Sequence, residues 1–375
     1  MKKKQKIIMS CPGGGHNIVK WFDYFDKNCD KYELTALCRS KYTFNHKNIR
    51  IVDAGNPVKL LISLFKLRSH RYDIFIRQGI SQSTSLKYIL LERILIKANK
   101  YFLLFWGNNF LLERLNRKRN EFQKQVINYF NGVIGTESIF SNFNYLHSEY
   151  KGKQIIHHWG FSYDFFQCSD EKNITDFTRN FLSTISKNDI FIFYPRSIIP
   201  LQRYDLIIEA INDIKSEKLE IIEKVKLVIW NGNVYDKNYK STLIDKINAY
   251  GLQDNIIIQE HPYLPENDVK VIWKKASFTM VISDHDGFST QIGEAFYFEK
   301  PVFTSMIMPY TILNDKNNWE LPMVENKVEE IKKELIKLIS TYHKTDKDVL
   351  VKRRLYVAKC LNFENNLTEL LETLN

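Results

Sequence analysis

Short runs of apolar residues alternate along this chain with longer segments in which apolar residues recur at helical spacing. A short apolar run is typical of a buried strand, and a period near 3.6 residues predicts a helix with one apolar face. In the first half this pattern predicts strands at 5–10, 33–37, 49–53, 73–77, 101–105, 132–135 and 154–157, with helices at 58–67 and 85–97. In the second half it predicts strands at 190–194, 226–230, 255–260, 278–282 and 301–304, with helices at 204–214, 240–250, 267–274, 290–298 and 328–342.

The alternation of strands and helices indicates βαβ units, which build parallel sheets. A polar stretch at 168–176 separates two successive sets of such units. We therefore predict an α/β fold of two Rossmann-like, doubly wound domains that face a central cleft. The first domain is expected at 1–167 and the second at 178–345, with the C-terminal helix at about 350–375 packing back on the first. Ligands of doubly wound sheets bind beyond the carboxyl ends of the strands, so the loops there are the candidate sites.

The composition excludes several classes of protein. A chain of 375 residues with 44% hydrophobic residues favours two domains with real cores and excludes global disorder. No apolar run reaches the roughly 18 residues of a membrane span, and the run after the basic start is too short for a secretory signal. The cysteines are odd in number and scattered, which argues against disulfides and zinc and fits a reducing cytoplasm; they are Cys11, Cys29, Cys38, Cys168 and Cys360.

Basic residues are concentrated in the first half of the chain. Residues 1–160 hold 27 Lys and Arg against 11 Asp and Glu, a charge of +16, and the remainder carries −5, for a total of +11. This imbalance suggests an anionic partner, either a membrane surface, a phosphorylated ligand or nucleic acid, but a lysine-rich solvated surface would also account for it. Two segments, 59–68 and 112–119, combine apolar and basic residues at helical spacing. They would either lie on an anionic membrane or pack as ordinary amphipathic helices on their own sheet.

The segment most informative for chemistry covers residues 283–295 and reads SDHDGFSTQIGEA. It follows a predicted strand, turns at Gly287 and enters a helix, for which Ser289 or Thr290 is a natural N-cap. The N–H groups of the first helical turn form an anion site. Asp286 precedes the turn and Glu294 lies on the helix, so both carboxylates can reach hydroxyls of a ligand whose phosphates lie at the helix end. The structural alternative is a strand-turn-helix junction with a buried capping carboxylate.

A second segment places two arginines between a strand and a helix. The strand at 190–194 is followed by Arg196, and Arg203 immediately precedes the predicted helix at 204–214. Arginine binds phosphate through planar, bidentate hydrogen bonds, so two arginines here could bracket a diphosphate. Surface ion pairs are the alternative interpretation of both side chains.

These two segments resemble the donor-binding motifs of retaining GT-B glycosyltransferases of family 4, the glycosyl transferases group 1. The family motif is written Glu-Gly-Phe-Gly, four residues, Glu-Ala, then Gly-x-Pro-Val. Its spacing is matched here by Asp286, Gly287-Phe288, Glu294-Ala295 and Pro301-Val302. The resemblance is best over 154–305 and implies a GT-B fold with an acceptor-binding first domain and a donor-binding second domain. Asp286 departs from the family, which usually has Glu at this position.

The resemblance implies a role for each residue of the two motifs. Asp286 would contact the donor sugar and Glu294 the nucleotide ribose, and the donor phosphates would bind at the turn formed by Gly287, Phe288, Ser289 and Thr290. Arg196 and Arg203 would stabilise the leaving diphosphate. Arg203 stands where the family has Lys, and Gln202 is the competing position for that role.

Three further segments fit the same family pattern. The turn at Asn231-Gly232 resembles the glycine turn near the donor phosphates, and His261 follows the strand that passes the nucleotide base. Gly14 and Gly15 resemble the Gly-Gly loop near the donor phosphates and the acceptor; glycines let the backbone approach a ligand closely, although a simple tight turn is the alternative. The spacing of these glycines fits neither the dinucleotide fingerprint nor a P-loop.

The weaker candidates are contacts to the acceptor or to the donor sugar. These are His16, Arg77 and Asn108. His16 alternatively caps a helix or faces solvent. Many relatives carry a histidine near 105–109, where this chain has Asn108 and Asn109; either amide could hydrogen-bond a sugar hydroxyl, but neither can act as a base.

The resemblance implies a hexosyltransferase that moves a sugar from a nucleotide-diphosphate sugar to a glycan or polyprenyl-linked acceptor with retention of configuration. It implies bacterial surface polysaccharide synthesis in the cytoplasm, with peripheral association at the inner face of the cytoplasmic membrane, no nucleic-acid partner, and no metal or other cofactor. Two other classes remain open at this point. A GT-B epimerase or phosphorylase would share the fold and the phosphate sites, and a non-enzymatic basic binding protein would account only for the charge.

Overall fold

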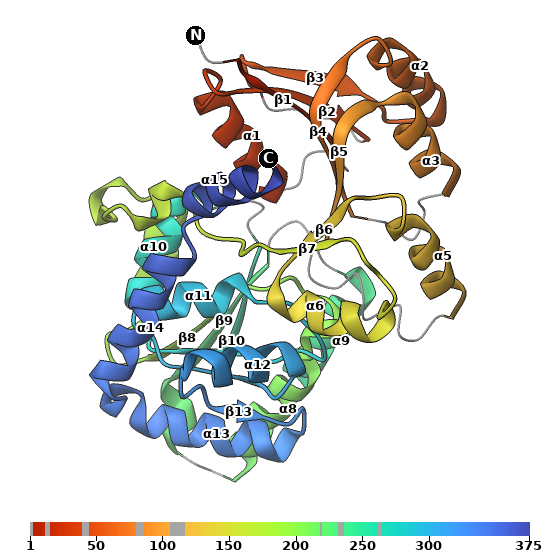
Figure 1. Cartoon of the computed structure of the whole chain (residues 1–375). Helices are drawn as coiled ribbons and strands as arrows, with labels where there is room; N and C mark the ends of the chain where they lie inside the picture. The colour runs from red at the N-terminus through yellow and green to blue at the C-terminus, as the bar shows by residue number, and fades with distance from the viewer. Residues whose placement is uncertain are drawn as a thin grey trace. The chain divides into compact units, whose positions relative to one another are not determined.

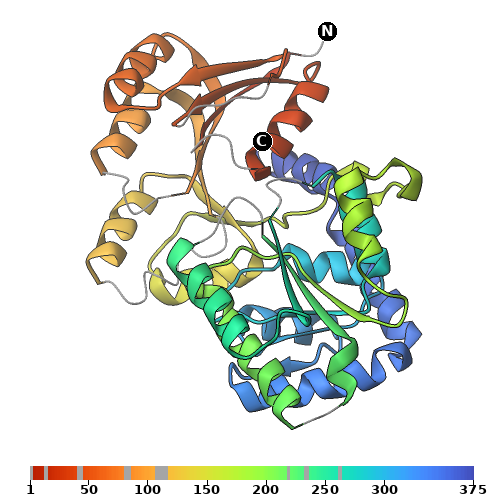
Figure 2. The same cartoon turned by 180° about the vertical axis from the view of Figure 1, so that it is seen from behind.

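The computed structural model describes residues 3–11, 16–39, 45–79, 86–105, 117–217, 220–231, 236–260 and 264–375. The chain forms two compact units (Figure 1; Figure 2 shows the reverse side). Unit 1 contains Met1–Trp159 and Phe363–Asn375, and unit 2 contains Gly160–Asn362. The polar stretch at 168–176 is therefore not the point of division. The chain enters unit 2 at Gly160. The N–H of the next residue, Phe161, donates to the carbonyl of Leu361 at 2.8 Å, and its ring stacks on Phe165.

Unit 1 is built on a parallel sheet of seven strands in the order β3-β2-β1-β4-β5-β6-β7. Successive strands are added on one side of β1 as far as β3 and on its other side from β4 onward. The strand order therefore reverses between β1 and β4, the point at which ligands of doubly wound sheets bind. The strands are β1 (Gln5–Cys11), β2 (Tyr32–Cys38), β3 (Ile49–Asp53), β4 (Arg71–Gln78), β5 (Lys97–Leu104), β6 (Gly132–Gly135) and β7 (Lys153–Ile156).

Helices cover both faces of this sheet because the strands are apolar on both sides. Ile7 and Met9 of β1 pack in a core with α1 (His16–Lys27) and α15 (Phe363–Leu374). Ile8 points to the opposite face, as alternation along a strand requires. That face is covered by α2 (Pro57–Leu67), α3 (Leu86–Leu95), α5 (Arg117–Ile127) and α6 (Glu137–Leu146).

Unit 2 contains two parallel sheets of three strands each, in the orders β10-β9-β8 and β11-β12-β13. A bridge between Ile192 and Phe278 joins β8 to the start of β11, so the two sheets continue one another. The strands are β8 (Ile190–Tyr194), β9 (Val225–Asn231), β10 (Ile256–Glu260), β11 (Thr279–Val281), β12 (Val302–Ser305) and β13 (Met323–Val324).

The helices of unit 2 also form two layers. One apolar core contains α8 (Tyr204–Ser216), α9 (Lys237–Ala249) and α13 (Val328–Thr341). The other contains α7 (Asp176–Ser183), α10 (Glu266–Lys275), α11 (Thr290–Tyr297), α12 (Met308–Asn317) and α14 (Lys347–Cys360). The predicted C-terminal helix is two helices: α14 packs on α11 in unit 2, and α15 belongs to unit 1. The predicted α/β class with doubly wound parallel sheets is confirmed.

Candidate active site

The guanidinium group of Arg196 joins the two predicted donor motifs. It follows β8, and its Nη2 lies 2.6 Å from Oδ2 of Asp286. Its Nη1 donates to Oγ of Ser289 at 2.6 Å, and its Nε donates to Oε1 of Gln202 at 3.0 Å. Asp286 and Ser289 come from the loop before α11, so residues about 90 positions apart in the chain form one polar cluster.

Asp286 is held from three directions. Besides Arg196, the N–H of Gly287 donates to its Oδ1 at 2.8 Å, and the hydroxyl of Tyr310 on α12 donates to its Oδ2 at 2.9 Å. Burial and the charge of Asp286 raise the pKa of Tyr310 well above its usual value, so this hydroxyl keeps its proton and remains a donor. Burial lowers the pKa of Arg196, but Asp286, Tyr310 and Tyr194 together raise it by more, so the pKa stands above its usual value. Arg196 is therefore a permanent cation.

The loops that carry this cluster are hydrogen-bonded to one another. The buried hydroxyl of Tyr194, the last residue of β8, donates to the carbonyl of Ile282 at 3.0 Å. The carbonyl of Leu201 accepts from the N–H of Asp284 at 3.0 Å and from Oγ of Ser283 at 3.1 Å. Neighbouring strands thus bring the two loops together, and these bonds fix their relative position.

Arg203 lies in a second cluster beside the first. Its backbone is left-handed, with φ 43 and ψ 42, and it immediately precedes α8. Its Nη1 lies 2.9 Å from Oδ1 of Asp284 and its Nη2 3.2 Å from Oδ2 of Asp205. The amide of Asn326 also donates to Asp284 at 3.0 Å. Arg203 is paired with two carboxylates, whereas Gln202, the competing position, is buried and orients Arg196.

The first turn of α11 has no side-chain cap. Ser289 is the N-cap residue, but its side chain makes no capping bond and its Oγ accepts from Arg196 instead. Thr290 is the first helical residue and is exposed. The N–H groups of an uncapped first turn can donate to an anion, as the sequence pattern predicts for phosphate.

The remaining residues of this motif pack around α11. Nε1 of Trp273 donates to Oε2 of the half-buried Glu294 at 2.9 Å. The half-buried ring of Phe288 packs on Trp319 with 5.9 Å between ring centroids. Close packing holds the helix here, since a Cβ on Gly293 would lie 2.8 Å from the ring of Phe161.

Several predicted contacts fall outside the part of the chain that the structure describes. These are Gly14, Gly15, Asn108, Gly232 and His261. For two others only the backbone is described: His16 begins α1 and Asn231 ends β9. Their predicted roles stay predictions.

Arg77 does not lie where an acceptor would contact it. Its side chain has no exposed surface, and its guanidinium pairs with the carboxylate of Glu92 on α3. Glu92 in turn accepts from Oγ of Ser10 at 3.0 Å. The arginine is thus part of the buried interior of unit 1, where an ion pair compensates its charge.

Tyr310 is the main site residue that the sequence pattern missed. It lies on α12, a helix with only a narrow buried face formed by Pro309, Tyr310 and Leu313, so no helical period identified it. The available signal was Pro309 in the first turn of the helix, where proline is favoured. Trp273 and Asn326 were missed for a different reason, since they contact the motifs only through tertiary packing.

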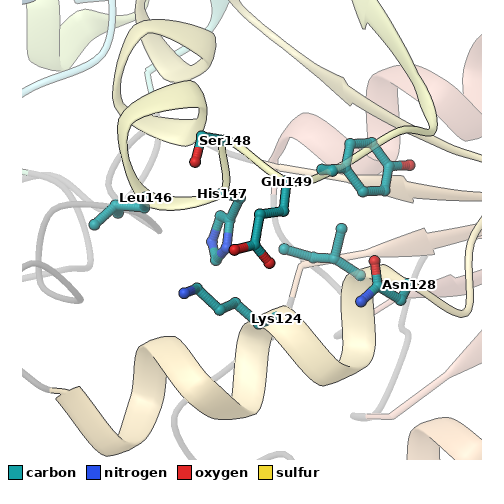
Figure 3. A pocket seen from close by; sticks show the side chains of 8 residues that line it. Lys124, Asn128, Leu146, His147, Ser148 and Glu149 are labelled. Atoms are coloured by element: carbon teal, nitrogen blue, oxygen red, sulfur yellow. The ribbon is translucent and has the colours of Figure 1, made fainter.

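Two pockets elsewhere contain none of the predicted donor residues. In unit 1, Lys124 and Asn128 at the end of α5 face His147, Ser148 and Glu149 across a cavity of about 130 Å³ (Figure 3). Burial and the charge of Lys124 lower the pKa of His147 to about 4. A pocket of about 470 Å³ in unit 2 is lined by residues that include Tyr297 and Arg354. Pockets for drug-sized ligands usually span about 300–1,000 Å³, so the cavity in unit 1 is too small for a nucleotide sugar.

No cluster of three or more His, Cys, Asp or Glu side chains suited to a metal ion occurs within the described ranges. None of the helices described here combines the length and the apolar character needed to cross a bilayer.

Comparison with known protein families defines the class of this enzyme. Residues 177–349 match the family described as glycosyl transferases group 1. The chain is a glycosyltransferase. The matched segment contains Arg196, Arg203, Asp286 and Glu294, so the domain that identifies the class also holds the polar cluster. A search of curated proteins found no match.

Solved structures identify the fold of the whole chain. A glycosyltransferase from Rickettsia africae has a TM-score of 0.76 at 13% identity, covering 99% of this chain and 98% of its own. Anabaena HepE in complex with UDP-glucose has a TM-score of 0.74 at 12% identity, covering 98% and 99%. Sucrose-phosphate synthase from Thermosynechococcus elongatus has a TM-score of 0.73 at 12% identity, covering 99% and 98%. At these identities the likeness establishes the fold alone, and that fold is GT-B, as predicted.

Proposed function

We propose that this glycosyltransferase is a retaining enzyme of family 4 that transfers a hexosyl group from a nucleotide-diphosphate sugar. The observation that carries the proposal is the cluster of Arg196, Asp286 and Ser289 at the uncapped start of α11. It combines a permanent cation, a set of N–H donors and a carboxylate in one place. These groups match the diphosphate and the sugar of such a donor.

Three parts of the donor have a corresponding protein group in this proposal. The phosphates accept from the N–H groups at the start of α11, and Asp286 accepts from a sugar hydroxyl. Glu294, which Trp273 holds at 2.9 Å, accepts from the ribose hydroxyls. The complexes of Anabaena HepE with UDP-glucose and with UDP and glucose support a nucleotide-sugar donor.

In the proposed reaction the bond between the anomeric carbon and the phosphate oxygen breaks, and the nucleoside diphosphate leaves with the electron pair. Arg196 stabilises the developing negative charge in a partly buried site, where an electrostatic contact is stronger than in water. The acceptor hydroxyl attacks the anomeric carbon from the face that the phosphate leaves, and its proton passes to the leaving phosphate. Configuration is then retained, and neither a metal ion nor a general base from the protein takes part.

Arg203 plays a smaller part in this proposal than Arg196. Arg196 contacts Asp286 and Ser289 at the start of α11, whereas the more exposed guanidinium of Arg203 pairs with Asp284 and Asp205 beside that cluster. The left-handed backbone at Arg203 and the hydrogen bonds of Leu201 keep it beside the first cluster. We therefore assign Arg203 to positioning the loop and to a secondary phosphate contact.

The acceptor is proposed to be a glycan or a polyprenyl-linked glycan in bacterial surface polysaccharide synthesis. The charge of +16 over residues 1–160 supports an anionic acceptor or an anionic surface that carries one. His16, Asn108 and the loop at Gly14 and Gly15 remain proposed contacts of the donor or acceptor. The enzyme would act in the cytoplasm at the inner face of the membrane, with no nucleic-acid partner.

A panel of nucleotide sugars in a thermal-shift assay tests the donor first. A ligand at about 100 times its Kd adds about 2.7 kcal/mol to stability and raises the melting temperature. The stabilising donor is then incubated with and without glycan acceptors, and free nucleotide is measured. We expect acceptor-dependent release. Acceptor-independent conversion to another nucleotide sugar would identify an epimerase, sugar transfer to inorganic phosphate would identify a phosphorylase, and absence of any shift would refute donor binding.

A further inference from the structure

Helix α2 of unit 1 exposes large apolar side chains along one whole face. Val58, Leu61, Ile62 and Phe65 are 67%, 41%, 50% and 55% exposed. Their positions follow the pattern i, i+3, i+4, i+7, which forms a single stripe on a helix. Isolated exposed apolar residues are normal on protein surfaces, but a contiguous stripe marks a surface that another phase or molecule covers.

The opposite face of α2 is already used by the core. Leu60, Leu64 and Leu67 are buried and pack with the sheet, and α2 also contacts α3 and β3. Both views show α2 at the outside of unit 1 with α3 beside it (Figures 1 and 2). Asn56 caps the helix by accepting from the N–H of Lys59 at 2.8 Å, and Pro57 occupies its first position. The helix is thus formed before any partner binds, and docking does not have to overcome a cost of folding.

Basic side chains accompany this apolar stripe. Lys59, Lys66 and Arg68 are exposed, and the sequence of α2, PVKLLISLFKL, contains no acidic residue. Asp53, at the end of β3, pairs with Lys59 at 2.6 Å. An apolar stripe with flanking lysine and arginine is the pattern of a helix that lies in the interface of an anionic bilayer, where basic residues are attracted to the negatively charged headgroups. A protein partner could bury the apolar stripe, but it would not by itself account for the excess of positive charge around the stripe.

We propose that Val58, Leu61, Ile62 and Phe65 insert into the surface of an anionic lipid bilayer, with Lys66 and Arg68 at the level of the headgroups. This inference deepens the proposed function, on which its biological meaning rests, because a membrane-docked enzyme can use a lipid-linked acceptor. The docking itself is a property of α2 and does not depend on donor chemistry.

Vesicle flotation with the full chain tests the proposal. We expect binding to vesicles of phosphatidylcholine with phosphatidylglycerol, weaker binding to phosphatidylcholine alone, and weaker binding at high salt. The double variant Leu61→Asp with Phe65→Asp should bind at least tenfold more weakly. Both side chains point outward, so its circular dichroism should match that of the wild type. The control is Leu355→Asp on α14, which replaces a single leucine that is 63% exposed, and it should bind like the wild type.

Three results would overturn the proposal. One is wild-type protein that floats with neither vesicle, and another is a double variant that floats as well as the wild type. The third is a wild type that is oligomeric in light scattering without lipid and becomes monomeric in the double variant, because the stripe would then be an interface between copies. A nucleotide-sugar thermal shift on the same samples separates this outcome from failure of donor binding, since the double variant should keep that shift.

Discussion

Nη2 of Arg196 and Oδ2 of Asp286 lie 2.6 Å apart, and the two side chains are only 15% and 16% exposed. The pair joins the loop after β8 to the loop before α11 at the point where donor phosphates and sugar are proposed to bind. Each partner compensates the buried charge of the other. A substitution at either position therefore affects both stability and turnover, and both quantities have to be measured for each variant.

Arg196→Ala is expected to lower kcat by about 100- to 1,000-fold, which corresponds to the loss of one preorganised donor to a developing anion. Arg196→Lys keeps the charge but loses the planar fork, so it should retain part of this activity and more of the stability. Initial rates at saturating donor and melting temperatures measure the two effects. The control is Arg179→Ala, which removes an exposed arginine and its ion pair with Asp176. This variant should behave like the wild type. Full turnover by Arg196→Ala would refute the proposed mechanism.

Tyr310→Phe removes the hydroxyl that donates to Asp286 at 2.9 Å and leaves the ring in place. A hydrogen bond to a charged group is worth about 1.5–3 kcal/mol, so we expect a loss of stability in that range and a loss of kcat of about tenfold. Chemical denaturation and initial rates are the measurements. In the matched control, Tyr297→Phe, the lost hydroxyl donates to the carbonyl of Phe166 instead, and kcat should not change. Equal kcat values for Tyr310→Phe and the wild type would show that Asp286 needs no such support.

Glu299 occupies a left-handed conformation with φ 53, at the position where the family motif has glycine. Its carboxylate pairs with Arg354 at 2.9 Å, but the pair is partly exposed and contributes little. Glu299→Gly should therefore stabilise the protein by about 0.5–1 kcal/mol, because glycine adopts this conformation without steric cost. Glu299→Ala loses the same ion pair and keeps the strain, so it should be less stable than Glu299→Gly in urea denaturation. The reverse order would mean that the ion pair outweighs the strain.

Acid should destabilise unit 1 between about pH 6.5 and pH 3. Burial lowers the pKa of His157 to about 3, and burial with Lys124 lowers that of His147 to about 4. Both groups titrate near 6.5 when unfolded. Below pH 6.5 the unfolded state thus binds more protons than the folded state. The stabilising contribution of the two neutral histidines is complete above this pH and is lost as the pH falls toward the folded pKa values.

Each buried histidine lowers the free energy of unfolding by at most about 1.4 kcal/mol per pH unit as the pH falls. His157→Phe should remove one such contribution. The ring of His157 packs on Trp159 with 4.4 Å between centroids. Its Nε2 has no hydrogen-bond partner among the described residues, so phenylalanine can replace it. Tryptophan fluorescence during urea denaturation at pH 7 and pH 5 measures the change, because Trp21 and Trp159 lie beside this ring. If the free energy of unfolding differed between pH 7 and pH 5 by the same amount in His157→Phe as in the wild type, His157 would be excluded as the source of the acid sensitivity.

Most elements could be predicted because their signals are local. Every strand that the apolar runs predicted is present, and every predicted helix overlaps one in the structure. The pattern missed α6, α7 and α12, and it divided α14 and α15 wrongly. Helix α12 has a narrow buried face, and α14 buries only Arg353 and Val357. Two-residue β13 is too short to give any periodic signal.

The sequence alone determined that the chain has two α/β halves. It also determined that the arginines, Asp286 and Glu294 occur in the order of a glycosyltransferase donor site. Both were readable because periodicity, caps and motif spacing are encoded in neighbouring residues. Only the tertiary structure decided which side chains meet and which faces stay uncovered. It paired Arg196 with Asp286 and Tyr310, withdrew Arg77 into the interior, and left the stripe of α2 exposed. The physical reason is that burial and charge pairing depend on segments distant in the chain, whose packing no local pattern records.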